Sequence, residues 1–182
     1  EGLMPGVDRP VAMIGIAEKG YVSVQLTAEA EGGHSSMPPK HTAVGILSQA
    51  VVDLENHPMP ARLAGAAKLL FDYVGPEMEF KKRLLFANTR LLKPLLLRKL
   101  AATPATNALI RTTTAATMLE GSIKDNILPV KARGVVNFRI LPGDRIEDVL
   151  EHVRETARDP KIVVSLAGGA QTEPSRLSRT DS

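Results

Sequence analysis

The segment YVSVQLTAEAEGGHSSMPP covers residues 21–39 and decides how the rest of the chain is arranged. Apolar and polar side chains alternate over residues 21–31, the pattern of a strand with one face covered and the other wet or facing a site. The glycine pair that follows permits backbone angles closed to other residues, and the proline pair stiffens the chain beyond it. The segment therefore predicts a strand followed by a tight, stiff bend that presents His34.

Composition excludes several classes of function. The 182 residues include no cysteine, which rules out disulfides, thiolate zinc sites and a cysteine nucleophile. No apolar run approaches the roughly 20 residues of a membrane span, and we expect no membrane partner. Aromatic residues at 3% and a net charge of +3 argue against a nucleic-acid surface. The sequence assigns no cellular compartment.

Further elements follow from periodicity. Apolar residues recur at helical spacing over 43–54, and alternation returns over 131–140, where Arg139 falls on the polar side. We expect further strands at 11–16, buried on both faces, at 107–119, which is rich in threonine, and at 162–166. Asp144 as N-cap with Glu147 three residues later resembles a capping box and predicts a helix that ends before Asp159-Pro160.

These elements predict an α+β fold of the ferredoxin-like type. It is a two-layer sandwich of a four-stranded antiparallel sheet with two helices on one face. In this layout the first and last strands are neighbours, so the chain enters and leaves at one edge and can be inserted into another domain. We accordingly expect connecting segments at 1–19 and 169–182 around a domain at 20–168, in a piece cut from a longer protein.

Residues 58–106 differ in character and are interpreted as a helical insertion. They are rich in leucine and alanine, and their nine basic residues against three acidic ones give a balance of +6. A solvated helix face explains this charge, but a face for another domain, for an acidic surface, or an adaptor role are alternatives.

Four motifs in this order carry a resemblance to a known family: residues 18–20 (EKG), 32–39 (GGHSSMPP), 125–129 (DNILP) and 136–144 (VNFRILPGD). Together they resemble the lid, or dimerisation, domain of the di-zinc aminoacylase and carboxypeptidase metallopeptidases. The branch most similar to this chain is carboxypeptidase S-like, whose lid also carries a long helical insertion.

The resemblance implies a hydrolase of peptides or N-acyl amino acids whose two zinc ions and glutamate base lie in a separate catalytic domain. Glu1-Gly2 is similar to the end of that domain's Asp-Glu-Gly motif. The four histidines show no His-x-Asp pair, and no zinc ligand is expected in this chain. We therefore expect the chain alone to be inactive.

The resemblance also implies site residues. His34 is the expected oxyanion donor in the opposite subunit, and Arg139 the expected anchor for the substrate carboxylate, with Asn126 adding a hydrogen bond to it. The alternatives are a surface or core histidine, a surface ion pair of Arg139, and a plain turn asparagine. A homodimer is expected through the sheet edge at 107–119 and the helix that begins near Ala43. The insertion at 58–106 could strengthen this contact, or it could shield the edge and leave a monomer.

One alternative comes from another class of function. The ferredoxin-like layout also serves small-molecule-binding regulatory modules such as amino-acid sensors. That interpretation accounts for a dimer and for the loops, but not for the pairing of the histidine motif with the arginine motif.

Overall fold

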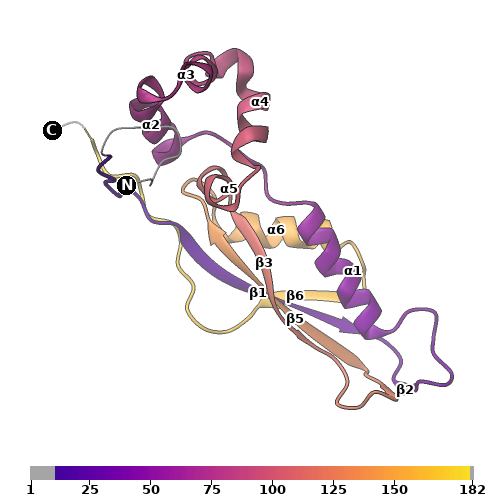
Figure 1. Cartoon of the computed structure of the whole chain (residues 1–182). Coiled ribbons are helices and arrows are strands. Elements are labelled where there is room, and N and C mark those ends of the chain that lie inside the picture. Colours follow the sequence, from indigo (N-terminus) through magenta and orange to yellow (C-terminus); the bar gives the residue numbers. More distant parts are fainter. Residues whose placement is uncertain (1–10, 181–182) are drawn as a thin grey trace. The chain divides into compact units, whose positions relative to one another are not determined.

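The computed structural model describes residues 11–180 and separates them into two compact units. The sheet unit comprises residues 19–59 and 112–174, and the helical unit comprises 11–18, 60–111 and 175–180. Figure 1 traces the chain through both. The predicted boundaries at 20, 58, 106 and 168 stay predictions, and the expected motif at Glu1-Gly2 lies outside the described residues.

The sheet unit has the expected ferredoxin-like architecture. Its four strands are antiparallel neighbours in the order β3-β5-β1-β6, so the first and last strands of the fold lie side by side. Two helices cover one face of the sheet (Figure 1). The elements are β1 (Gly20–Glu29), α1 (Ala43–Asn56), β3 (Thr113–Glu120), β5 (Lys131–Ile140), α6 (Ile146–Ala157) and β6 (Ile162–Leu166). The fold prediction is confirmed.

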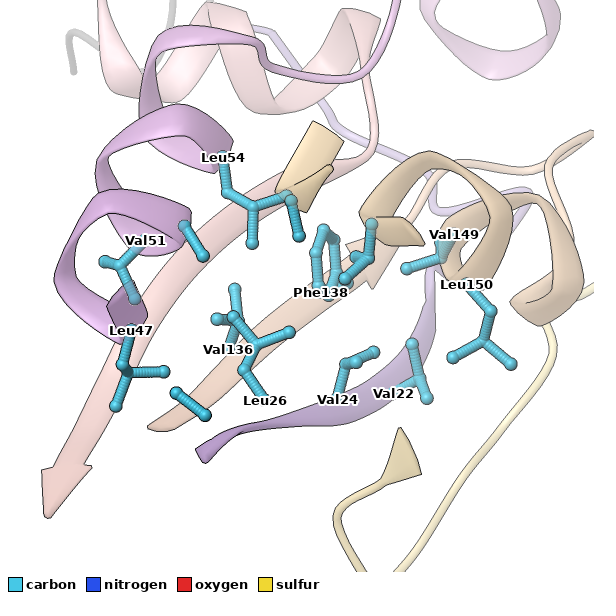
Figure 2. Packing of buried hydrophobic residues seen from close by; sticks show 14 of the residues in the cluster. Val22, Val24, Leu26, Leu47, Val51, Leu54, Val136, Phe138, Val149 and Leu150 are labelled. Carbon is cyan, nitrogen blue, oxygen red and sulfur yellow. The ribbon is translucent and has the colours of Figure 1, made fainter. Parts of the chain in front are cut away.

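The hydrophobic core of this unit lies between the sheet and the two helices. Alternate residues of β1 and β5 are fully buried and meet the apolar faces of α1 and α6, as Figure 2 shows. Burying a valine, leucine or phenylalanine side chain contributes about 1.5–3 kcal/mol. The largest fully buried side chains of this core are Phe138, Leu26, Leu54, Ile140, Val22, Val24, Val136, Val149 and Val153.

The predicted strand at 107–119 is wrong in its first part. Residues Pro104–Ile110 form helix α5, and β3 begins only at Thr113. The Thr103 hydroxyl accepts a hydrogen bond from the Thr106 amide, and Pro104 occupies the first turn, where its missing N–H costs nothing. Pro104 therefore starts a helix at a place where the sequence pattern suggests a break.

The predicted N-cap of α6 is also wrong. Arg145 is the cap residue, and its amide donates to the Asp148 carboxylate over 2.8 Å. Asp144 instead accepts a hydrogen bond from the hydroxyl of Thr112, which is fully buried and in turn accepts from the Leu141 amide at 2.8 Å. The Asp144 carboxylate therefore helps fix the chain where it re-enters the sheet unit.

The helical unit has a hydrophobic core of its own. The rings of Phe71 and Phe86 stack with their centroids 4.7 Å apart. Other buried members are Val74, Met78, Leu96, Leu100 and Ile110. The helices are α2 (Gly65–Val74), η1 (Gly75–Glu77), α3 (Phe80–Ala87), α4 (Thr89–Leu100) and α5.

The apolar run at residues 11–16 does not have the predicted structure. Residues 11–16 form no strand; Ile14 is exposed, and the Ile16 carbonyl accepts one hydrogen bond from the Ser178 amide. The expectation of a buried strand there was wrong, because a six-residue run without a partner strand has no ladder to join.

None of the described helices is long and apolar enough to cross a bilayer.

The Thr112 contact gives a prediction. Thr112→Val keeps the shape of the side chain but leaves the buried Leu141 amide without its acceptor, which costs about 1–3 kcal/mol. Urea denaturation and hydrogen exchange of the Leu141 amide measure the loss, with Thr113→Val at the neighbouring residue as control. Unchanged values for both quantities in Thr112→Val would contradict this assignment.

Candidate functional site

His34 lies on a short two-stranded extension of the sheet unit that the sequence does not predict. The Ala30 amide donates to the Val130 carbonyl over 3.0 Å, and β2 (Gly33–His34) then pairs with β4 (Ile127–Leu128). We name residues 30–37 with 126–130 the histidine arm. Sequence signals for this ladder are weak, because each of its strands is only two residues long.

Both glycines of the arm are required by its geometry. A Cβ atom on Gly32 would lie 2.7 Å from Cγ2 of Val130, closer than side chains approach. Gly33 has a φ angle of 155°, which other residues rarely adopt. The backbone is thus fixed immediately before the histidine, as the sequence pattern predicts.

The His34 ring is exposed and has a defined tautomer when neutral. Its Nδ1 atom lies 3.2 Å from the Ser36 backbone nitrogen and 2.9 Å from the Ser36 hydroxyl. Because a backbone N–H can only donate, Nδ1 is the acceptor and the ring proton resides on Nε2. The imidazole therefore presents Nε2–H as a hydrogen-bond donor on the edge of the ring that faces away from Ser36.

Arg139 lies on β5 and faces the side of the sheet without helices. It is exposed, and its guanidinium carbon lies 4.7 Å from the centroid of the Tyr21 ring. The Tyr21 hydroxyl accepts a hydrogen bond from Ser23, whose own hydroxyl accepts from the Asn137 amide group, each at 3.2 Å. Within residues 11–180 Arg139 forms no ion pair, so its fixed neighbour is an aromatic ring.

Lys19 is a second cation at this end of the sheet, and its sequence context predicts only a turn residue. Burial lowers the pKa of Lys19 to about 8; the Asp144 carboxylate opposes this shift, and the Arg139 charge adds to it. The positive charges of Lys19 and Arg139 repel each other and outnumber the one carboxylate of Asp144, so this end of the sheet favours a further anion.

Asn126 lies on the histidine arm. Its carbonyl accepts a hydrogen bond from the Ser35 amide over 3.1 Å, one residue from His34. The structure therefore brings Asn126 together with His34, and within one chain it does not bring Asn126 to Arg139.

His34 and Arg139 lie at opposite ends of the sheet unit. Arg139 pairs with Tyr21 near the start of β1, whereas the histidine arm follows the end of that strand at Glu29. The eight residue steps from Tyr21 to Glu29 span about 26 Å at 3.3 Å per residue. Figure 1 shows β2 beyond the end of β1. One copy of the chain therefore does not bring the two side chains to one small ligand.

The described residues do not fit a zinc ion. Within residues 11–180 no three side chains of histidine, aspartate or glutamate converge as metal ligands do. What these residues offer is an imidazole donor at one end of the sheet and a pair of cations at the other.

Comparison with known proteins assigns the chain to a family. The model of the peptidase dimerisation domain of the M20 family matches residues 16–163. The chain belongs to the M20 peptidase dimerisation domain family. The predicted resemblance is confirmed, and membership in this family speaks against the alternative of an amino-acid sensor.

Several relatives of this M20 domain are curated proteins. It is 40% identical over 180 residues to "Probable carboxypeptidase S-like 2" of Dictyostelium discoideum, covering 99% of this chain and 34% of the relative. It is 38% identical over 182 residues to the "N-fatty-acyl-amino acid synthase/hydrolase PM20D1" of Mus musculus, covering 100% of this chain and 36% of that protein. The chain thus spans about a third of the length of these relatives.

Solved structures share the fold of this M20 domain. The dipeptidase Dug1p of Saccharomyces cerevisiae has a TM-score of 0.52 at 16% identity, covering 97% of this chain and 40% of that one. Human carnosine dipeptidase 1 has a TM-score of 0.50 at 12% identity, covering 93% and 41%. At these identities the likeness concerns the fold.

The hydrogen bonds of His34 give a prediction for this M20 domain. Long-range proton–nitrogen NMR at a pH where the rings are neutral will show His34 with its proton on Nε2. His57 is the internal control, because its Nδ1 lies 2.8 Å from the Asp53 carbonyl and must donate to it. A His34 proton on Nδ1 would show that the Ser36 contact does not set the tautomer.

Proposed function

We propose that the chain is the lid and dimerisation domain of a zinc-dependent hydrolase, either a carboxypeptidase or an N-acyl-amino-acid amidohydrolase. The observation that carries the proposal is the position of His34. Its ring is exposed, with the proton on Nε2, and it lies beyond the opposite end of β1 from Arg139 and Lys19. The names of the relatives, carboxypeptidase S-like and N-fatty-acyl-amino acid synthase/hydrolase, support the reaction class. The zinc would belong to a catalytic domain, and this chain alone hydrolyses nothing.

His34 is the oxyanion donor in this proposal. Attack of water on an amide carbonyl places negative charge on the carbonyl oxygen, and a donor aimed at that oxygen lowers the barrier. The exposed Nε2–H is suited to this role because Ser36 occupies the other ring nitrogen. The pairing of β2 with β4 holds the backbone that carries the ring, so the donor needs little reorganisation during the reaction.

Arg139 is the anchor for the substrate's free carboxylate. A guanidinium can donate to both carboxylate oxygens, and stacking on Tyr21 orients its plane. Lys19 adds positive charge at the same end of the sheet. Asn126, with its backbone fixed beside His34, adds a hydrogen bond to the substrate from the histidine arm.

These assignments require two copies of the chain. In a peptide or an N-acyl amino acid the scissile carbonyl and the free carboxylate are only a few bonds apart. In one copy of the chain, the length of β1 between Arg139 and the histidine arm is already about 26 Å. Both side chains reach one substrate only when they come from different subunits. The homodimer is therefore part of the proposed active site.

The proposed contact between subunits uses the edge strand β3 and helix α1. β3 forms one edge of the four-stranded sheet, and an unpaired edge favours pairing with its own copy across a two-fold axis. Met118 and Leu119 on β3 are exposed, as are Val44 and Val52 on α1. A Cβ atom on Gly121 would lie 2.9 Å from the Val44 side chain, so this strand end and this helix start are adjacent.

One prediction of this proposal concerns His34 in the full-length enzyme. His34→Ala removes the donor and raises the barrier by about 2.7–4 kcal/mol, so turnover slows by roughly two to three orders of magnitude while KM changes much less. Steady-state kinetics measure both parameters, and His34→Gln, which keeps an N–H donor, recovers part of the lost turnover. Unchanged turnover in His34→Ala would remove the claim, and zinc-dependent hydrolysis by the isolated chain would contradict its proposed inactivity.

Another prediction of this proposal concerns the dimer. Leu119→Glu places two like charges near the two-fold axis and shifts the chain to monomers in analytical ultracentrifugation. Val163→Glu on β6, another exposed apolar residue of an edge strand, is the matched control and leaves the dimer intact. Equal dissociation by both variants, or by neither, would reject the β3 contact.

A further inference from the structure

Helices α3 and α4 carry the highest density of positive charge in the chain. Residues 80–100 include seven lysine and arginine residues and no aspartate or glutamate. This exceeds the net charge of the whole chain, which is +3. The proposed function assigns no role to this segment.

The same two helices expose large apolar side chains in pairs. On α3, Phe80 is 68% exposed and Leu84 is 52% exposed; on α4, Leu91 is 80% and Leu95 is 47% exposed. Phe80 and Leu84 are four positions apart and lie on one side of α3. Leu91 and Leu95 flank a kink in α4, where Leu92 has non-helical backbone angles (φ −101°, ψ 15°) and Pro94 follows.

These pairs point away from the core of the helical unit. Leu85 and Phe86 on α3 pack against that core, and Leu96 and Leu100 on α4 are buried in it. At 100° per residue Leu85 and Phe86 fall roughly opposite Phe80 and Leu84 on the helical wheel of α3. On α4 the contrast is one of burial, since Leu96 and Leu100 are buried whereas Leu91 and Leu95 are exposed. Each helix therefore buries some apolar side chains in the unit and leaves others largely exposed.

Basic side chains flank the exposed pairs. Lys81 and Arg83 lie beside Phe80, and the Arg83 guanidinium carbon is 5.7 Å from the centroid of the Phe80 ring. Arg90 and Lys93 are exposed beside Leu91. Apolar tips surrounded by cations are the composition of helices that lie in the headgroup region of a membrane.

We propose that α3 and α4 bind the surface of an anionic lipid bilayer. Phe80, Leu84, Leu91 and Leu95 would enter the boundary between headgroups and acyl chains, while the flanking cations meet lipid phosphates and carboxylates. An acidic protein surface would satisfy the charges but leave these four apolar side chains without a matching environment, which favours lipid.

This inference revises the expectation of no membrane partner. That expectation rested on the absence of a run long enough to span a bilayer, and a helix that lies on the surface needs no such length. The proposal goes beyond the proposed function and does not depend on it, because binding to vesicles is measured without any hydrolysis.

The test uses the 182-residue chain and sedimentation with vesicles of phosphatidylcholine, with and without phosphatidylserine. We expect binding to the anionic vesicles that falls with added salt. Lys81→Glu/Arg90→Glu/Lys93→Glu weakens it at least about tenfold, since each basic residue contributes about 1 kcal/mol near such a surface. Phe80→Ser/Leu84→Ser/Leu91→Ser/Leu95→Ser weakens it similarly.

Matched controls lie in the sheet unit. Lys124→Glu/Arg133→Glu/Lys161→Glu changes the net charge equally, and Val163→Ser/Leu166→Ser removes exposed apolar side chains; both keep binding within about twofold. Circular dichroism checks that each variant folds, and the charge variant alone decides the test should the apolar variant unfold.

Three outcomes would overturn the proposal. They are no binding to anionic vesicles, equal loss in the matched controls, and binding to soluble polyglutamate that the apolar variant leaves unchanged. The last result would assign the segment to an acidic protein partner instead.

Discussion

The ten-residue antiparallel ladder between β1 and β5 is the constraint on which the rest of this domain depends. It pairs every residue from Gly20 to Glu29 with a partner on β5. Because such a ladder is stiff and extended, it holds the features at its two ends apart. His34 follows one end and Arg139 lies at the other, so the ladder decides which residues can share a ligand and which need a second copy.

The same ladder divides its side chains between the two faces of the sheet. Alternate residues point into the core under α1 and α6, and the others face the side of the sheet that carries Tyr21, Ser23, Asn137 and Arg139. A shift of one residue in pairing would exchange the two sets, so the buried valines and leucines also fix the position of the arginine. The helical unit keeps its own core, which explains how a segment of about fifty residues is tolerated between α1 and β3.

The sequence predicted those features that rest on strong periodicity. Alternation located β1 and β5, helical spacing located α1 and α6, and the glycine and proline pairs indicated the bend before His34. Residues 107–110 were wrongly predicted to begin a strand, because the threonine-rich pattern beyond them does not record that the Thr103 hydroxyl caps a helix by accepting the Thr106 amide. Lys19 and the Ser36 contact with His34 were missed, since both depend on distances between residues that no pattern records.

The central claim is that one active site takes His34 from one subunit and Arg139 from the other. The direct measurement mixes two inactive full-length enzymes, His34→Ala and Arg139→Ala, under conditions where subunits exchange. Each mixed dimer then has one site with both residues intact, and an equal mixture should regain about a quarter of wild-type activity. A mixture that stays as inactive as its two components, although mixed dimers have formed, would contradict the claim.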